Sequence, residues 1–158
     1  MGFETAIPLQ DITLRLLAAT LCGAVLGLDR EMRGKEAGLR TNTLVALSSA
    51  LTTLVALELY WGLTEAQRAG DMDPTRVIQG VAQAIGFISA GVMIRSGGSV
   101  HGATTAAVIW MAGALGIACG AGFYSLAGVA VLLSLVVTVF FTFVMRRLPV
   151  SPRSESEE

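Results

Sequence analysis

The sequence predicts an all-α fold: a polytopic membrane protein built as a compact bundle of five transmembrane helices. Hydrophobic residues make up 53% of its 158 positions and charged residues only 15%, whereas a soluble domain carries about a quarter charged residues. Five apolar segments each approach the ~20 residues that cross a hydrocarbon core ~30 Å thick. The charges gather in the short segments between them. A net charge of −1 indicates little about partners, because the two signs occupy different loops.

The five expected spans follow one another closely along the chain. They cover residues 9–28, 41–61, 77–94, 103–120 and 123–145. The third and fourth are short and rich in glycine, so a tightly packed hairpin is an alternative to two separate crossings. The expected domains are a short outer segment at 1–8, a membrane domain over 9–147 and a disordered cytoplasmic tail over 148–158. Since the first span lacks the basic leading segment of a signal peptide, we expect it to be retained.

The basic residues predict the orientation of the chain in the membrane. With five crossings, eight of them share one side: Arg30, Arg33, Lys35, Arg40, Arg95, Arg146, Arg147 and Arg153. The other side holds only Arg68 and Arg76. By the positive-inside rule the larger group is cytoplasmic, so the N-terminus lies outside and the C-terminus inside.

Small residues recur at four-residue spacing in three of the spans, a pattern that lets helix backbones approach closely in lipid. The expected packing positions are Gly23, Gly27, Ala82, Gly86, Ala90, Gly91, Ala112, Gly116 and Gly120. Contacts between helices of one chain are the favoured interpretation, and a homodimer is the alternative.

Several polar residues lie in or beside the spans on the outer side. Arg15 sits about two turns into the first span, where we expect it either to pair with Asp11 or to face an internal cavity. An outer polar vestibule would contain Arg15, Glu58, Gln79 and Gln83, the two glutamines sharing one helix face. Interfacial snorkelling and hydrogen bonds between helices explain these residues about as well.

The two cysteines are expected to be apolar packing residues. Cys22 lies in the cytoplasmic half of the first span and Cys119 near the outer end of the fourth. Their depths then differ by on the order of 15–20 Å, beyond the ~7 Å limit for a disulfide. With a single histidine and no metal-ligand cluster in its sequence, the chain is expected to be neither an enzyme nor a cofactor protein.

The most charged segment, GLDREMRGKEAGLRTNTLV at residues 27–45, interleaves acidic and basic residues with glycines. Asp29 ends the first span, where the helix dipole disfavours an anion, so a cation must compensate for it. Thr41 or Asn42 is expected to cap the second span. The interleaved signs fit a folded, hydrogen-bonded cap and not a basic lipid-binding patch, but spacing alone favours a solvated loop that only sets topology.

The segments GAVLGLDREMRGKEAGLRTNTLVALSSAL, DPTRVIQGVAQAIGFISAGVMI and VHGATTAAVIWMAGALGIACGAGFY resemble the MgtC/SapB family over roughly residues 14–125. The positions that carry the resemblance are Asp29, Arg30, Glu31, Lys35, Ala37, Gly38, Leu39, Arg40, Thr41, Gly86, Phe87, Ala90, Gly91, Gly102, Thr104 and Thr105. Ser89 stands where the family commonly has glycine. His101 stands where it commonly has arginine and replaces a fixed cation with a group that titrates near neutrality. The short tail predicts a form without the soluble C-terminal domain of many members.

The resemblance implies a functional cluster at the cytoplasmic ends of the first four spans. Its expected members are Asp29, Arg30, Glu31, Lys35, Arg40, Thr41, Asn42, Arg95, His101 and Thr104. It further implies a non-enzymatic bacterial inner-membrane protein, without a cofactor, that supports growth at low magnesium and survival inside macrophages. The implied partner is an F-type ATP synthase or another ATPase, through which membrane potential is controlled. The alternative is a transporter or channel for an ion or small solute, with the glycine-interrupted third and fourth spans as broken helices.

Overall fold

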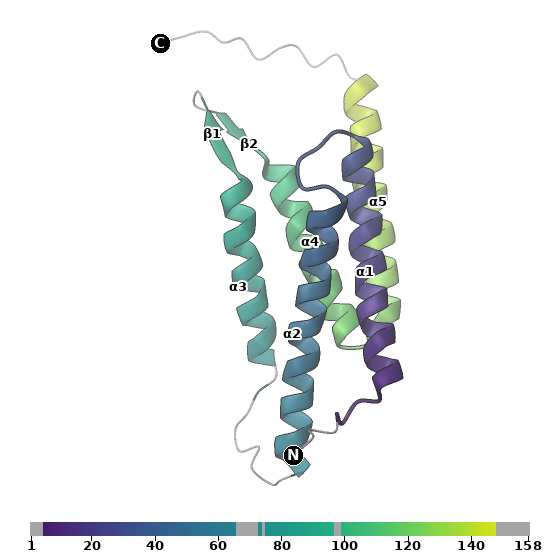
Figure 1. The fold of residues 1–158 in the computed structure, drawn as a ribbon. Coiled ribbons are helices and arrows are strands. Elements are labelled where there is room, and N and C mark those ends of the chain that lie inside the picture. Colours follow the sequence, from purple (N-terminus) through teal and green to yellow (C-terminus); the bar gives the residue numbers. More distant parts are fainter. Residues whose placement is uncertain (1–4, 66–72, 74, 97–98, 148–158) are drawn as a thin grey trace.

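The chain folds into five helices and one short β-hairpin. The computed structural model describes residues 5–65, 73, 75–96 and 99–147. Its elements are α1 (Leu9–Met32), α2 (Leu39–Glu65), α3 (Thr75–Val92), β1 (Ile94–Ser96), β2 (Ser99–His101), α4 (Ala103–Gly120) and α5 (Tyr124–Arg147) (Figure 1). The predicted bundle of five helices is confirmed. The expected tail at 148–158 lies outside the described residues.

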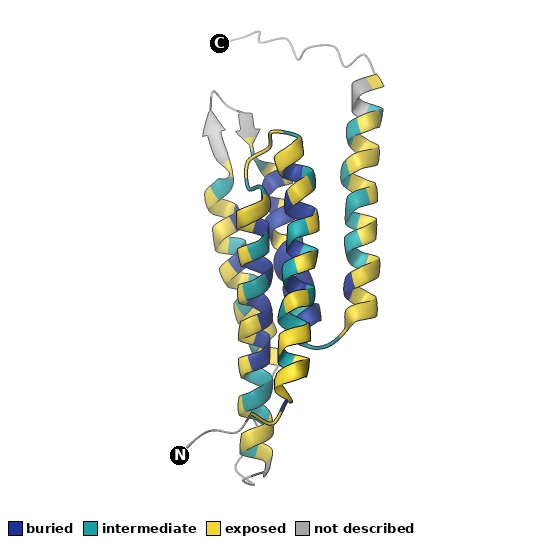
Figure 2. Ribbon diagram, turned by 45° about the vertical axis from the view of Figure 1, so that its right-hand side comes forward, coloured by how far each residue is buried: buried dark blue, intermediate teal, exposed yellow. Residues whose placement is uncertain are grey.

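Helix α4 forms the centre of the bundle and contacts each of the other four helices. Its buried positions continue from Thr105 to Gly120 around much of the helix, because it is apolar on all sides and surrounded by protein. The buried residues of α1 and α2 face the same centre, whereas α5 is exposed along most of its length (Figure 2). The core therefore lies where α1, α2 and α4 meet.

Four of the described helices are long and apolar enough to cross a membrane: α1, α2, α4 and α5. Helix α3 is the exception, because polar residues such as Arg76, Gln79 and Gln83 interrupt its apolar sequence. It nevertheless lies alongside α4, and Ile85 of α3 sits against Gly113 of α4. Both α3 and α4 run without interruption, so the expectation of broken helices at their glycines is wrong.

One end of the bundle collects the segments that the sequence predicts to lie together. The loop at residues 33–38, the β1–β2 hairpin and the C-terminus of α5 are all at this end, which we call the hairpin end (Figure 1). The start of α1, the C-terminal end of α2 and the start of α3 are at the opposite end. The placement of the hairpin end in the cytoplasm stays a prediction.

The hairpin replaces what the sequence suggested was a plain turn between the third and fourth spans. Its strands are antiparallel, with Ile94 opposite His101. Gly102 follows with φ of 87°, a backbone conformation that favours glycine. A Cβ at this position would lie 2.7 Å from the Val92 carbonyl oxygen. The end of α3 and the start of α4 are thus held against each other.

Candidate functional site

The loop between α1 and α2 is held in place by Glu31 on one side. Its Oε2 accepts a hydrogen bond from the Leu39 backbone N–H, with an N–O distance of 2.7 Å. This N–H is one of the unpaired donors at the start of α2. The expectation that Thr41 or Asn42 caps this helix is therefore wrong: α2 begins two residues before Thr41, and its cap comes from the preceding helix.

Asn42 holds the same loop from the other side. Its side chain is fully buried, and Nδ2 donates to the carbonyl oxygens of Ala37 at 2.5 Å and Gly38 at 2.9 Å. Ala37 has φ of 52°, a left-handed conformation that costs about 1–2 kcal/mol for a residue with a Cβ. The Asn42 amide thus holds the loop at a strained residue, a feature often found at functional sites.

Arg30 connects the loop to the centre of the bundle. Its side chain is only 5% exposed, and Nη2 donates both to the Glu36 carbonyl oxygen at 3.3 Å and to the hydroxyl of Thr105 in α4. The position in the last turn of α1 is favourable for a cation, because the helix dipole is negative there. We call the side chains of Arg30, Glu31 and Asn42 the loop latch. The latch makes the segment a folded, hydrogen-bonded cap.

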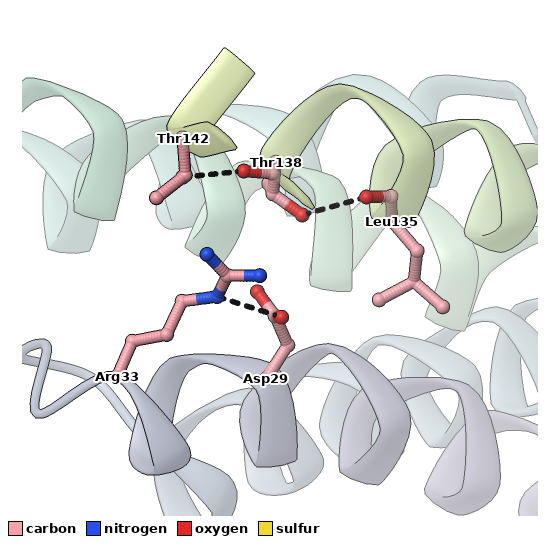
Figure 3. Close-up of polar contacts among 5 residues, drawn as sticks. All are labelled: Asp29, Arg33, Leu135, Thr138 and Thr142. Carbon is pink, nitrogen blue, oxygen red and sulfur yellow. Dashed lines mark hydrogen bonds and ion pairs between the residues drawn. The ribbon is translucent and has the colours of Figure 1, made fainter. Parts of the chain in front are cut away.

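Asp29 is compensated by Arg33, which lies four residues further along the chain as the C-cap of α1. The Nε of Arg33 lies 2.9 Å from Oδ1 of Asp29. The pair points toward α5, beside Thr138 and Thr142, whose hydroxyls donate to Leu135 and Thr138 carbonyl oxygens of their own helix (Figure 3). The anion that the sequence places at an unfavourable helix end is therefore stabilised by the residue that directly follows α1.

The remaining members of the expected cluster lie on the surface of the hairpin end. Lys35, Arg40, Thr41, His101 and Thr104 are all exposed. Arg95 lies in β1 opposite Val100, and its side chain is outside the described residues. The expected cluster thus divides into the loop latch, whose side chains bond to the loop backbone, and, among the described side chains, a set of exposed ones that make no such bond. We use the name cap surface for Lys35, Glu36, Arg40 and Thr41.

Thr105 and Ser89 are buried polar residues that the expected cluster omits. Thr105 is the partner of Arg30, whereas its neighbour Thr104, which the sequence favours, is exposed. The Ser89 hydroxyl is buried in α3. Among the described residues the Ser89 hydroxyl has no hydrogen-bond partner, and neither do Oδ1 of Asn42 or Nε of Arg30. These three buried atoms, which lie toward the hairpin end, are therefore still able to form a hydrogen bond.

Within the described part of the chain, no hydrogen bond or ion pair joins the four residues of the expected outer vestibule. Nη1 of Arg15 donates to the Gly120 carbonyl oxygen at 2.9 Å and so caps the C-terminus of α4. The ion pair with Asp11 that the spacing suggests is absent from the described residues. Glu58 accepts the backbone N–H groups of Ala6 and Ile7 at 2.7 and 2.8 Å. The two side chains thus hold backbone segments in place.

The small residues of α1 and α4 pack closely against neighbouring helices, whereas those of α3 do not. A Cβ at Gly23 would lie 2.6 Å from the Asn42 carbonyl oxygen, and one at Gly120 would lie 2.6 Å from that of Ala50. Gly27 and Gly116 are equally close to the α2 backbone, so α1, α2 and α4 pack through these positions. In contrast, Gly86 and Gly91 of α3 have no heavy atom within 4 Å of such a Cβ, and Ala90 is exposed.

The cysteines are much closer than their sequence positions suggest. The Sγ atoms of Cys22 and Cys119 are 4.0 Å apart, and both thiols are free. The expected separation of about 15–20 Å is therefore wrong. Cα–Cβ bonds lean toward the N-terminus of a helix, and α1 and α4 are antiparallel, so the two side chains lean toward each other along the bundle axis.

Comparison with known proteins gives a consistent family assignment. The pattern of the MgtC family matches residues 16–147. The chain is 40% identical to Protein SapB of Bacillus subtilis over 139 residues, which is 87% of this chain and 60% of that protein. It is 42% identical to Protein MgtC of Brucella abortus over 123 residues, or 78% of this chain and 48% of that protein.

A third relative carries a different name. The chain is 39% identical over 133 residues to the protein named putative magnesium transporter YhiD of Escherichia coli, covering 83% of this chain and 60% of that protein. The chain thus spans about half to three fifths of the length of these curated relatives. No solved structure matches it. With most of its length matched by the family pattern, the chain belongs to the MgtC family.

Proposed function

We propose that this chain is a non-enzymatic regulatory membrane protein that acts by binding another membrane protein through its hairpin end. The observation that carries the proposal is the division of the charged segment into two sets. The loop latch, in which Arg30 and Asn42 are buried and Glu31 is exposed, bonds to the backbone of Glu36, Ala37 and Leu39. Lys35 and Arg40 are exposed, and within the described part of the chain neither side chain has a hydrogen-bond or ion-pair partner. A preorganised loop that displays unpaired charges loses little entropy when it binds a partner.

The proposed physiological role follows from membership of the family. The chain supports growth in low magnesium and intracellular survival by modulating an F-type ATP synthase or another ATPase, and hence the membrane potential. Its hairpin end faces the cytoplasm, so that the cap surface meets the cytoplasmic part of the partner. Electrostatic complementarity favours an acidic partner surface beside Lys35 and Arg40.

The test replaces the two exposed cations without touching the latch. In a strain lacking the gene, the Lys35→Gln/Arg40→Gln variant should fail to restore membrane potential and ATP level at low magnesium, because it removes the charges that bind the partner. Arg76→Gln, an exposed cation at the opposite end, is the matched control and should restore both. Membrane levels of all variants are measured by immunoblot, and the topology of the double variant is checked because it removes two cytoplasmic charges.

Two results would overturn the proposal. The first is a deletion strain with unchanged membrane potential and ATP. The second is full complementation by the double variant. Photocrosslinking from position 40 in mild detergent, followed by mass spectrometry, identifies the partner, with position 76 as the control.

Transport of an ion or small solute is the second candidate function. It is favoured by the partnerless buried oxygens of Asn42 and Ser89, since neutral oxygens are ligands for hard cations such as Mg²⁺, and by the name of the Escherichia coli relative. Magnesium uptake into proteoliposomes separates the two functions. Uptake that is present in the natural chain and lost in Ser89→Ala would favour transport, and uptake no faster than in empty liposomes would exclude it.

A further inference from the structure

Helix α4 begins at the hairpin end without a side chain that caps it. Its N-cap residue is Gly102, which has no side chain to accept a hydrogen bond from the first turn. The backbone N–H groups of Ala103, Thr104 and Thr105 have no acceptor in the part of the chain that the structure describes. The start of α2 at the same end differs, because Glu31 caps it. Since Ala103 and Thr104 are exposed, the positive end of the α4 dipole is open to a ligand from the surface.

A buried cation lies against this first turn of α4. Arg30 is only 5% exposed, and its Nη2 donates to the hydroxyl of Thr105, the third residue of the helix. Among the described residues, neither Nε nor Nη1 of Arg30 has an acceptor. Nε is shielded from solvent, whereas Nη1 is not. The guanidinium therefore brings two unused donor nitrogens to the open start of α4, and one of them can be reached from outside.

The acidic residues of the charged segment do not pair with Arg30. Asp29 forms its ion pair with Arg33, and the Glu31 carboxylate bonds to the start of α2. Glu36 accepts from Arg30 through its backbone carbonyl, while the residue itself is exposed. Across the described part of the chain, no carboxylate forms an ion pair with Arg30.

The helix dipoles do not neutralise this cation either. The C-terminal end of α1 contributes about −0.5 of a charge and the N-terminal end of α4 about +0.5. These two contributions cancel, so about one positive charge remains where Arg30 meets Thr105. A buried cation without a charged partner is costly. An anion held between the guanidinium and the first turn of α4 would compensate for both.

We propose that Arg30 and the first turn of α4 form a binding site for an oxyanion of the phosphate type. The N–H groups at the start of a helix bind phosphate oxygens readily, and the planar N–H donors of arginine match the same oxygens. Nη1 of Arg30 and the backbone N–H groups of Ala103 and Thr104 are the donors assigned to the ligand. A soluble phosphate and a phospholipid headgroup both carry this chemistry. The site does not include the exposed cations Lys35 and Arg40, so it does not depend on the proposed partner.

Titration calorimetry with inorganic phosphate tests the site in the full chain, purified in a non-ionic detergent and held at constant ionic strength. The natural chain should bind one phosphate. Thr104→Asp should weaken binding by about tenfold or more, because its carboxylate occupies the start of α4 and repels the ligand. This variant should fold at least as stably as the natural chain, since an anion at a helix N-terminus is favourable. Thr41→Asp is the matched control, because it makes the same change in the first turn of α2 at the same end, and it should bind phosphate as the natural chain does.

A competition experiment identifies the source of the anion. Phosphatidic acid, and diacylglycerol with the same acyl chains, are added to the phosphate-bound chain. Displacement of phosphate by phosphatidic acid but not by diacylglycerol would assign the site to a lipid headgroup. Phosphate that stays bound in the presence of both lipids would assign it to a soluble ligand.

The proposal fails if neither phosphate nor phosphatidic acid binds saturably to the natural chain. It also fails if Thr104→Asp binds phosphate as tightly as the Thr41→Asp control, because the anion would then lie elsewhere. Arg30→Gln, measured below its melting temperature, should weaken phosphate binding as Thr104→Asp does. Unchanged binding in this variant would remove the cation from the site and overturn the assignment.

Discussion

Arg30 and Arg40 lie at the same end of the bundle, yet their environments differ in almost every respect. Arg30 is buried and donates to Glu36 and Thr105, whereas Arg40 is exposed. Replacing Arg30 leaves a buried hydroxyl and a loop carbonyl without their donor, and replacing Arg40 does not. Stability is therefore expected to depend on the first residue and partner binding on the second.

We predict that Arg30→Gln lowers the free energy of unfolding by about 1.5–3 kcal/mol, the usual contribution of a buried hydrogen bond to a charged group. Arg40→Gln is expected to change it by less than about 0.5 kcal/mol, as is typical of exposed positions. Thermal unfolding of the purified variants in detergent, followed by circular dichroism, measures both. Equal shifts of the two melting temperatures would show that Arg30 has no special role in the loop.

Sequence reasoning singled out a segment that the structure shows to be held by hydrogen bonds, but it assigned some of the structural roles to the wrong side chains. It selected Thr104 and not Thr105, because α4 is apolar around its whole circumference and offers no periodic pattern that reveals its inner face. It placed the cap of α2 on Thr41 or Asn42, since capping rules consider neighbouring residues and the actual cap, Glu31, lies eight residues away. Contacts that depend on how two helices meet leave no local signal.

At the scale of helices, the close approach of α1 to α2 depends on a missing side chain. A Cβ at Gly27 would lie 2.6 Å from the Leu39 Cα and 2.8 Å from the Gly38 carbonyl oxygen. Both are backbone atoms, so they move only if the helix and the latched loop move. Here the sequence pattern predicted the packing surface well, because small residues at four-residue spacing leave a groove on one helix face.

Gly27→Ala is expected to destabilise the bundle by about 1–3 kcal/mol, the usual penalty for overpacking. Gly128→Ala is the matched control, because Gly128 lies in α5 with no heavy atom within 4 Å of an added Cβ. This control should be neutral or slightly stabilising, since alanine favours a helix more than glycine does. The fraction of each variant that stays monodisperse after heating in detergent reports the difference, and the packing argument fails if the two variants behave alike.

The thiol pair tests the contact between α1 and α4 directly. Oxidation with diamide should join Cys22 and Cys119 within one chain, because their Sγ atoms are 4.0 Å apart and need to close to ~2.05 Å. Intact mass should fall by about 2 Da as two S–H bonds are replaced by one S–S bond, and both thiols should become unavailable to maleimide after denaturation. In the Cys119→Ala control, Cys22 should still be labelled within the monomer.

Labelling of both thiols after oxidation of the natural chain would instead support the large separation that counting residues suggests. That count treated each side chain as level with its Cα. It missed that α4 ends beside Arg15, six residues into α1, which brings Cys119 toward the level of Cys22. The side chains of the two antiparallel helices also lean toward each other, which shortens the remaining distance. The hairpin at residues 94–101 was missed for a related reason, since strands of three residues are too short to show a periodic pattern.

At the scale of the whole molecule, the charged loop and the β-hairpin form a polar end, and the five helices form an apolar body. The number and order of the helices were predictable, because long apolar segments and charged loops are strong signals. The differences in burial among the helices were not predictable. Helix α4 is enclosed and α5 is almost fully exposed, and such differences arise only when the helices are placed around each other.

The orientation of this arrangement is the prediction on which the proposed function depends. In a background with Cys22→Ala and Cys119→Ala, Lys35→Cys and Thr104→Cys occupy exposed positions at the hairpin end, and Gln10→Cys and Trp61→Cys occupy exposed positions at the opposite end. A membrane-impermeant maleimide should label the second pair in intact cells and the first pair only after the inner membrane is permeabilised, because the eight basic residues retain their end in the cytoplasm. Labelling of positions 35 and 104 from different sides would contradict the fold itself. Labelling of both in intact cells would keep the fold and invert its orientation, which would place the cap surface where no cytoplasmic part of an ATPase can reach it.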